Sequence, residues 1–230
     1  MKIIGTGSAL PEQIVTNEDL TKFLDTSDEW IVSHTGIRER RVLDRESVND
    51  IGTLAARRAL EDAGLALEEL DLLICSNVAS DYFTPGPACF IAGALGFSGQ
   101  TLDMNGACTG FLQALDIADA YLRAGKARNV LIVAAEKPSY LADWTDRATC
   151  VLFGDGAGAV VLQNSEPSGC IATCIATQPN EDFLNMPTPA GNCPFTHREG
   201  AGGYLRMNGQ EVYRFAVSSC VRDLRAVCEK

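Results

Sequence analysis

One cysteine of the chain stands in a setting that would make it a nucleophile. Cys108 lies in the segment Asp103–Phe111, DMNGACTGF, with Gly106 and Gly110 two residues away on either side. This is the G-x-nucleophile-x-G spacing of a nucleophile elbow, with Cys in place of Ser. A helix N-terminus favours a thiolate, and its free N–H groups can bind an oxyanion. A thiol placed there is suited to accepting an acyl group from a thioester.

The same residues also allow a purely structural interpretation. Free cysteines are most often small buried side chains, and Cys108 would then fill a strand–helix junction. The residues alone favour the two interpretations equally. No metal site is expected, because the nine cysteines contain no C-x-x-C pair and both His34 and His197 lie far from any cysteine pair.

Three further features have competing interpretations. The glycine-rich run at residues 154–158 precedes a strand-like AVVL segment, which favours a turn into a hairpin over a phosphate-binding loop. Trp30 is either a core anchor or an exposed ring that stacks on an adenine. The basic run consists of Arg38, Arg40, Arg41 and Arg45. We interpret it as a solvated segment, and the alternative is a binding site for a phosphate-bearing substrate or an acidic partner.

Strands and helices alternate along the chain, which predicts an α/β layered fold with a largely parallel central sheet. Capping residues predict helices that begin after Thr16 or Asn17, after Ser27 and after Ser47. Further helices are predicted at residues 85–95, 109–124 and 210–228, and a long loop at 179–203. Apolar runs predict strands at residues 2–7, 71–77, 101–104, 129–135, 157–162 and 170–176.

Composition excludes several classes of protein. The chain has 230 residues, 30 acidic and 19 basic side chains and a net charge of −11, and 46% of it is hydrophobic. This apolar content excludes disorder, and the negative charge disfavours binding to duplex DNA. The longest apolar runs, such as residues 130–135, are far shorter than a membrane span, and the start MKIIGTGSALPE is too short for a signal peptide. An odd number of scattered cysteines indicates reduced thiols, so we expect a cytoplasmic protein.

Six segments together carry a resemblance to a known family. They read IIGTGSALPE, TNEDL, DTSDEWIVSHTGIRER, NGACTGF, FGDGAGAVVL and MNGQEVYRFAV. The chain resembles 3-oxoacyl-acyl-carrier-protein synthase III of the thiolase superfamily. The DTSDEWI–TGIRER and FGDGAGA blocks are specific to that family, whereas NGACTGF fits the wider superfamily. The resemblance implies a thiolase-like layered α-β-α-β-α fold. Residues 1–165 would form its N-terminal half with the nucleophilic Cys, and residues 166–230 only the start of the C-terminal half.

The resemblance implies an acyltransferase that initiates type II fatty-acid biosynthesis in the cytoplasm. Cys108 would take the acyl group of an acyl-CoA primer, commonly acetyl-CoA. Malonyl-acyl-carrier protein would then lose CO2 and attack that thioester to give 3-oxoacyl-acyl-carrier protein. The expected partners are acyl-CoA, the acyl carrier protein and a second copy in a homodimer, with no nucleic acid and no membrane. No cofactor or metal is expected, since the CoA thioester is a substrate.

Individual roles carry over to matching positions. Phe83 matches a residue that reaches across the dimer interface into the partner's acyl pocket, and Arg214 matches a basic position that docks the carrier protein. His34 stands where some members have an Arg that contacts a CoA phosphate. Trp30 and Arg147 match the pair that sandwiches the adenine. The positions that match CoA-binding residues are Thr26, Trp30, Arg147, Phe153 and Tyr213, the last of which is often Phe.

Two alternatives stay open on the sequence alone. The family completes its catalytic triad with a His and an Asn placed beyond the last helix read here, and neither His34 nor His197 lies in that context. A non-catalytic short form or fragment that binds CoA, or that pairs with a full-length synthase, is therefore one alternative. The other is a related acyl-CoA condensing enzyme of secondary metabolism, such as a polyketide starter enzyme.

Overall fold

The computed structural model describes residues 1–187 and 202–229. Its internal contacts divide the chain into two compact units, which are described separately. The first unit comprises Met1–Val15, Arg40–Pro138 and Gly154–Thr173. The second comprises Thr16–Glu39, Ser139–Phe153 and Cys174–Lys230.

A five-stranded sheet forms the centre of the first unit. Its strands lie in the order β1-β7-β6-β4-β5, so β1 and β5 are the edges. Strand β4 pairs parallel with β5 and β6, whereas β7 pairs antiparallel with both β6 and β1. Four strands therefore run in one direction, as a largely parallel sheet requires, and β7 is reversed. The bounds are β1 Lys2–Ala9, β4 Leu72–Ser76, β5 Gln100–Met104, β6 Asn129–Glu136 and β7 Gly156–Gln163.

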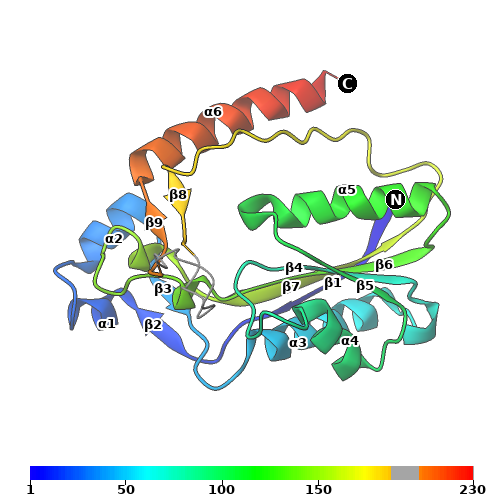
Figure 1. Ribbon diagram of the computed structural model, residues 1–230, viewed down its shortest axis with the longest axis horizontal. Coiled ribbons are helices and arrows are strands. Elements are labelled where there is room, and N and C mark those ends of the chain that lie inside the picture. The colour runs from blue at the N-terminus through cyan, green and yellow to red at the C-terminus, as the bar shows by residue number, and fades with distance from the viewer. Residues whose placement is uncertain (188–201, 230) are drawn as a thin grey trace, which may run out of the picture. The chain divides into compact units, whose positions relative to one another are not determined.

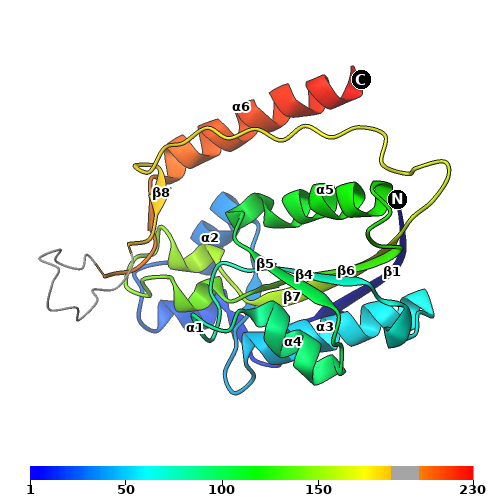
Figure 2. The ribbon, with the colours of Figure 1, turned by 45° about the vertical axis from the view of Figure 1, so that its right-hand side comes forward.

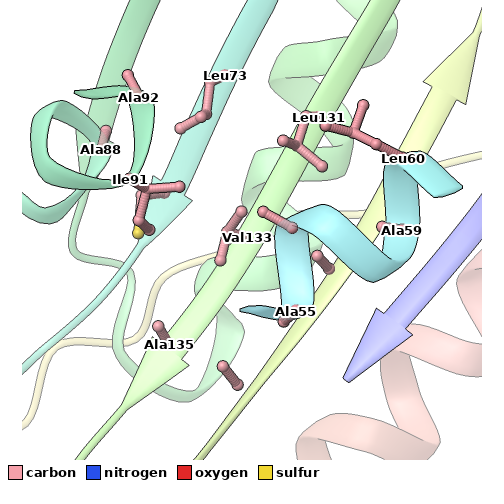
Figure 3. Close-up of a cluster of buried hydrophobic side chains, with 14 of the residues drawn as sticks. Ala55, Ala59, Leu60, Leu73, Ala88, Ile91, Ala92, Leu131, Val133 and Ala135 are labelled. Carbon is pink, nitrogen blue, oxygen red and sulfur yellow. The ribbon is translucent and has the colours of Figure 1, made fainter. Parts of the chain in front are cut away.

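Helices cover both faces of this sheet (Figures 1 and 2). Helices α3 (Val48–Ala63) and α4 (Pro87–Leu95) lie on one face, and α5 (Gly110–Arg123) lies on the other. Successive strand residues point to opposite faces, so alternate residues of one apolar run enter different clusters. Leu131 and Val133 pack toward α3 and α4 (Figure 3), whereas their neighbour Ile132 packs toward α5. Burial on both faces explains why the strands read as continuous apolar runs.

Capping residues set the helix boundaries where the sequence predicts them. The Ser47 Oγ accepts a hydrogen bond of 3.1 Å from the Asp50 N–H, and the Asp50 carboxylate accepts one of 2.9 Å from the Ser47 N–H. Helix α3 ends at Gly64, whose φ of 60° only glycine adopts readily. This capping box is confirmed, and it fixes the helix that packs across β1 and β7.

The second unit contains shorter elements and one long helix. Helices α1 (Asn17–Thr21) and α2 (Asp28–Thr35) begin after Thr16 and Ser27 as predicted. Strand β8 (Leu184–Asn185) pairs with β9 (Arg206–Met207), and α6 spans Gly209–Cys228. Elsewhere in the chain β2 (Ile14–Thr16) pairs with β3 (Glu39–Arg41). Single 3₁₀ turns lie at Leu67–Glu69, Ala107–Thr109, Pro138–Tyr140 and Cys150–Leu152.

One prediction about regular structure is wrong. The segment 170–176 is not a strand, because the described residues offer it no neighbouring strand for the hydrogen bonds that hold one. The predicted hairpin is present, since β7 pairs antiparallel with the preceding strand β6, and the connection between them spans residues 137–155. The predicted loop at 179–203 includes β8, and Cys193 and His197 lie outside the described residues.

Two general properties bear on function. Across residues 1–187 and 202–229, no helix is both long enough and apolar enough to cross a bilayer. Every cysteine in the described part of the chain is a free thiol. Cys75 is buried within β4, whereas Cys108 is exposed.

Candidate active site

Cys108 lies in a short turn between a strand and a helix, as the sequence predicts. Strand β5 ends at Met104, a 3₁₀ turn spans Ala107–Thr109, and α5 follows at Gly110. The side chain of Cys108 is exposed at this junction. The interpretation of Cys108 as a buried filler is therefore wrong, and its thiol is accessible to a substrate.

Side chains within the turn hold its backbone in place. The Asn105 Oδ1 accepts a hydrogen bond of 3.1 Å from the Ala107 N–H. The Thr109 hydroxyl donates to the Gly106 carbonyl at 3.0 Å, and the Gln113 amide donates to the Thr109 hydroxyl at 2.9 Å. These contacts link the residues before and after Cys108. They fix the backbone on both sides of the nucleophile, so its position does not depend on α5 alone.

The strained residue of the turn is Ala107, not a glycine. Ala107 has a φ of 46°, and no other non-glycine residue in the described ranges has a positive φ. This conformation costs on the order of 1–3 kcal/mol and persists only where the surroundings enforce it. Gly106 has a φ of −110° and Gly110 a φ of −54°. Neither glycine therefore supplies an unusual backbone angle in this turn.

The two glycines instead allow close packing. A Cβ added to Gly110 would overlap the Ser76 hydroxyl at the end of β4. A Cβ added to Gly106 would lie 2.8 Å from the Gly110 Cα and 3.0 Å from the Gln113 side chain. Ser76 is only 3% exposed, so its hydroxyl has little room to move away. Any larger residue at either position would displace the turn that carries Cys108.

Two acidic groups near the carboxyl ends of the strands are partly desolvated. Burial raises the pKa of the Asp103 carboxyl. The carboxylate also accepts a hydrogen bond of 2.8 Å from the Ala88 N–H, which lowers the pKa by a smaller amount. Burial also raises the pKa of Glu136. The pKa of the Cys75 thiol is raised chiefly by burial and further by the charges of Asp103 and Glu136. Cys75 is therefore a core thiol whose thiolate is disfavoured, in contrast to the exposed Cys108.

The FGDGAGA block has a structural role in the first unit. The Asp155 N–H donates a hydrogen bond of 2.7 Å to the Arg41 carbonyl, and the Asp155 carboxylate accepts one of 2.8 Å from the Leu43 N–H. Strand β7 begins at Gly156, so the prediction that this run leads into a strand and not a helix is confirmed.

The interpretation of the basic run as solvated is wrong for Arg40, which is 6% exposed.

An aromatic and cationic group forms around Trp30 in the second unit. The guanidinium of Arg147 lies 4.8 Å from the centroid of the Trp30 ring. The His34 ring stacks on Trp30 with centroids 4.3 Å apart and an interplanar angle of 25°. Trp30 is half-buried, whereas its neighbour Ile31 is fully buried. The core anchor of α2 is therefore Ile31, whereas the Trp30 ring contacts the side chains of His34 and Arg147.

Three contacts with backbone groups hold these side chains. The Ser27 Oγ accepts a hydrogen bond of 3.1 Å from the Trp30 N–H and so caps α2. The Arg147 guanidinium donates one of 2.5 Å to the Asp25 carbonyl. The His34 Nδ1 lies 2.7 Å from the Trp30 carbonyl oxygen. The pairing of His34 with Trp30 is a feature that we missed in the sequence, although their spacing of i and i+4 on a helix is a signal for it.

The remaining predicted site residues differ in their surroundings. The Thr26 hydroxyl oxygen is buried and has no hydrogen-bond partner. Phe153 is half-buried, and Tyr213 is 71% exposed on α6. Arg214 forms an ion pair of 2.6 Å with Glu211 one helical turn earlier. Phe83 is 96% exposed. Cys108 and Phe83 belong to the first unit, and the other predicted site residues belong to the second.

Comparison with known proteins identifies the family. The model of the 3-oxoacyl-[acyl-carrier-protein] synthase III family matches residues 102–179. A beta-ketoacyl-[acyl-carrier-protein] synthase III of Clostridium acetobutylicum is 44% identical over 232 residues, which cover 100% of this chain and 71% of that protein. The beta-ketoacyl-[acyl-carrier-protein] synthase III of Aquifex aeolicus is 46% identical over 232 residues, which also cover 100% of this chain and 71% of that protein. The chain belongs to the 3-oxoacyl-acyl-carrier-protein synthase III family.

Solved structures agree with this family and its thiolase-like fold. The synthase III of Aquifex aeolicus superposes with a TM-score of 0.82 at 42% identity and covers 99% of this chain and 71% of that one. A priming beta-ketosynthase of a polyketide pathway superposes with a TM-score of 0.85 at 33% identity, covering 96% and 67%. The identity to the Aquifex aeolicus synthase III is higher than the identity to this polyketide enzyme. As a synthase III, the chain is an acyltransferase of the condensing type, and the function it serves is the initiation of fatty-acid synthesis.

Proposed function

We propose that Cys108 accepts the acyl group of an acyl-CoA primer and passes it to malonyl-acyl-carrier protein. The observation that carries this proposal is the exposed thiol of Cys108 on a turn held by Asn105, Thr109 and Gln113. A nucleophile in a fixed orientation loses less freedom when it reaches the transition state. We propose acetyl-CoA as the primer because the family commonly uses it.

The first step is a thioester exchange. The Cys108 sulfur attacks the carbonyl carbon of the acyl-CoA, and the carbonyl oxygen takes up negative charge in the tetrahedral intermediate. Backbone N–H groups at the start of α5 are suited to stabilising this oxyanion. When the intermediate collapses, the bond to the CoA sulfur breaks, CoA leaves as a thiolate that takes up a proton, and the acyl group stays on Cys108.

The second step forms the carbon–carbon bond. Malonyl-acyl-carrier protein loses CO2, and the electron pair of the broken bond becomes a carbanion next to the thioester. This carbanion attacks the acyl carbon on Cys108. The products are 3-oxoacyl-acyl-carrier protein and a free Cys108 thiolate, which can accept another primer.

We assign the second unit to CoA recognition. Trp30 and Arg147 would hold the adenine between a ring face and a guanidinium. Their present separation of 4.8 Å leaves no room for a second ring, so Arg147 must move outward when CoA binds. The buried and unpartnered hydroxyl of Thr26 supports a polar ligand nearby. Phe153 and Tyr213 would line the same channel.

We assign the carrier-protein contact to Arg214 and the dimer contact to the first unit. Arg214 is exposed on α6, and its ion pair with Glu211 would open to bind an acidic partner. Strand β5 is an edge of its sheet, and an edge strand can receive a strand from a second copy. The 96% exposed Phe83 would then enter the acyl pocket of that copy. We further propose a cytoplasmic location, where a catalytic thiol stays reduced.

Intact-mass measurement after incubation with acetyl-CoA tests the acyl transfer. We expect a mass increase of one acetyl group, and we expect Cys108→Ala to abolish it. Cys89→Ala is the matched control, because Cys89 is also an exposed thiol of the first unit. An adduct that survives Cys108→Ala would disprove the assignment.

Light scattering on the protein as it elutes from a size-exclusion column tests the proposed dimer. A single monomeric species at the concentration used in the assay would contradict the dimer.

A further inference from the structure

The segment Asn77–Gly86 has neither helix nor strand, yet three consecutive residues at the end of β6 hold it. The Asn77 amide donates a hydrogen bond of 2.5 Å to the Ala135 carbonyl. The Glu136 carboxylate accepts one of 3.1 Å from the Val78 N–H and lies close to the Ala79 N–H. These contacts fix the beginning of the segment directly to the central sheet.

An ion pair fixes the middle of the same segment. The Lys137 ammonium lies 2.7 Å from the Asp81 carboxylate, and the two side chains are only 14% and 18% exposed. The other Asp81 oxygen accepts a hydrogen bond of 3.3 Å from the Asn49 N–H in the first turn of α3. A shielded ion pair that also satisfies a helix N-terminus is costly to break, because either charge alone would stay partly buried.

The residues beyond Asp81 are held as well, with one exception. The Tyr82 ring stacks on Phe90 of α4 with centroids 4.8 Å apart. Phe83 is the exception, because it is 96% exposed although it follows two anchored residues. A large apolar side chain presented to solvent from a fixed backbone is typical of a residue that enters a partner's pocket.

We propose that Glu136 and Lys137 are positioning residues for Phe83 and that they thereby determine which primer lengths the enzyme accepts. This inference rests on the proposed role of Phe83 in the acyl pocket of a second copy. The depth of such a pocket depends on where the Phe83 ring lies. A pocket discriminates one methylene group by about 10- to 200-fold, so a small displacement of the ring changes the preference measurably.

The test compares the rates at which acetyl-CoA and butyryl-CoA acylate Cys108, measured by intact mass. We expect Phe83→Ala to shift the preference toward butyryl-CoA by about 10-fold or more. We expect Lys137→Met to shift the same preference by about 5-fold. When Phe83→Ala is already present, adding Lys137→Met should shift the preference by less than about 2-fold, because Lys137 acts through the position of Phe83. The doubly changed Asp81→Asn, Lys137→Met protein removes both charges and should show the same shift if the single variant folds poorly.

Asp71→Ala is the matched control. The Asp71 carboxylate accepts hydrogen bonds of 2.7 Å and 3.1 Å from the N–H groups of Arg128 and Asn129 at the opposite end of β6. It makes the same kind of contact to the same strand without touching the segment that carries Phe83. We expect its primer preference to match that of the unchanged protein. In Glu136→Ala, hydrogen exchange at the Val78 and Ala79 amides should become faster, and in Asp71→Ala it should not.

The outcomes separate this inference from the function on which it rests. If the unchanged protein takes no acyl group on Cys108, the proposed function and the inference both fail. If Phe83→Ala leaves the preference unchanged, the role of Phe83 is wrong and the inference falls with it. If acylation and the Phe83→Ala shift occur but Lys137→Met stays within about 2-fold of the unchanged protein, the inference alone is overturned.

Discussion

The guanidinium carbon of Arg147 lies 4.8 Å from the centroid of the Trp30 ring. These residues are far apart in the sequence, and both are held by contacts to the backbone around Asp25–Trp30. The cation–π contact keeps the two members of the proposed adenine site paired before a ligand arrives. The site is therefore partly organised in advance, and only the side chain of Arg147 needs to move.

Loss of the Arg147 guanidinium should weaken CoA binding. We expect Arg147→Ala to raise the dissociation constant for CoA by about 2- to 5-fold, because an exposed cation–π contact is worth about 0.5–1 kcal/mol. Isothermal titration with CoA measures the effect. Arg222→Ala removes another exposed arginine of the second unit, one that is paired with Asp223, and should leave the affinity unchanged. Equal affinities in all three proteins would contradict the assignment.

Loss of the Ser27 cap should affect both stability and CoA binding. The Ser27 Oγ accepts from the N–H of Trp30 itself, so the cap orients the residue that we assign to the adenine. We expect Ser27→Ala to lower the free energy of unfolding by about 1 kcal/mol and also to weaken CoA binding. Ser47→Ala removes the comparable cap of α3. It should lower stability by a similar amount without changing CoA affinity, and a loss of affinity there would argue against a local effect.

A side chain at Gly110 should destabilise the protein and displace the nucleophile. A Cβ at this position would overlap the Ser76 hydroxyl. We expect Gly110→Ala to cost about 1–3 kcal/mol in urea unfolding and to slow acylation of Cys108. Ser76→Gly should restore part of both losses. Gly93→Ala in α4 meets no atom within 4 Å and should be neutral or stabilising by up to about 1 kcal/mol. If Ser76→Gly brings no recovery, the contact is not the cause.

The raised pKa of Glu136 predicts a pH dependence of stability. Burial raises the pKa of this carboxyl in the folded state above its ordinary value of 4.5, so the folded protein binds the proton more tightly than the unfolded chain. Protonation therefore stabilises the folded state as the pH falls through the folded pKa toward 4.5. Glu136→Gln removes this contribution and keeps an oxygen that can accept from Val78.

Urea unfolding of both proteins between pH 7 and about pH 5 measures this dependence. We expect the unchanged protein to gain stability relative to Glu136→Gln as the pH is lowered. The difference between the two proteins is the quantity to compare, because other carboxyl groups titrate equally in both. Curves that remain parallel over this range would show that Glu136 is not desolvated.

Local signals in the sequence were sufficient for the helix boundaries and for the turn that carries Cys108. A cap such as Ser47 with Asp50 acts within one helical turn, so its residues identify it wherever the rest of the chain lies. The strand, turn and helix around Cys108 are likewise consecutive, and the alternation of apolar runs indicated the α/β sheet.

Contacts between distant parts of the chain decided the rest. The reason for a glycine at position 110 is the close approach of Ser76, which no spacing in the sequence connects to it. The segment 170–176 has the apolar pattern of a strand, but no strand among residues 1–187 and 202–229 pairs with it. Lys137 reaches Asp81 only because the end of β6 lies beside the segment that follows β4. Pairing and close packing are properties of neighbours in space, and only the tertiary structure specifies those neighbours.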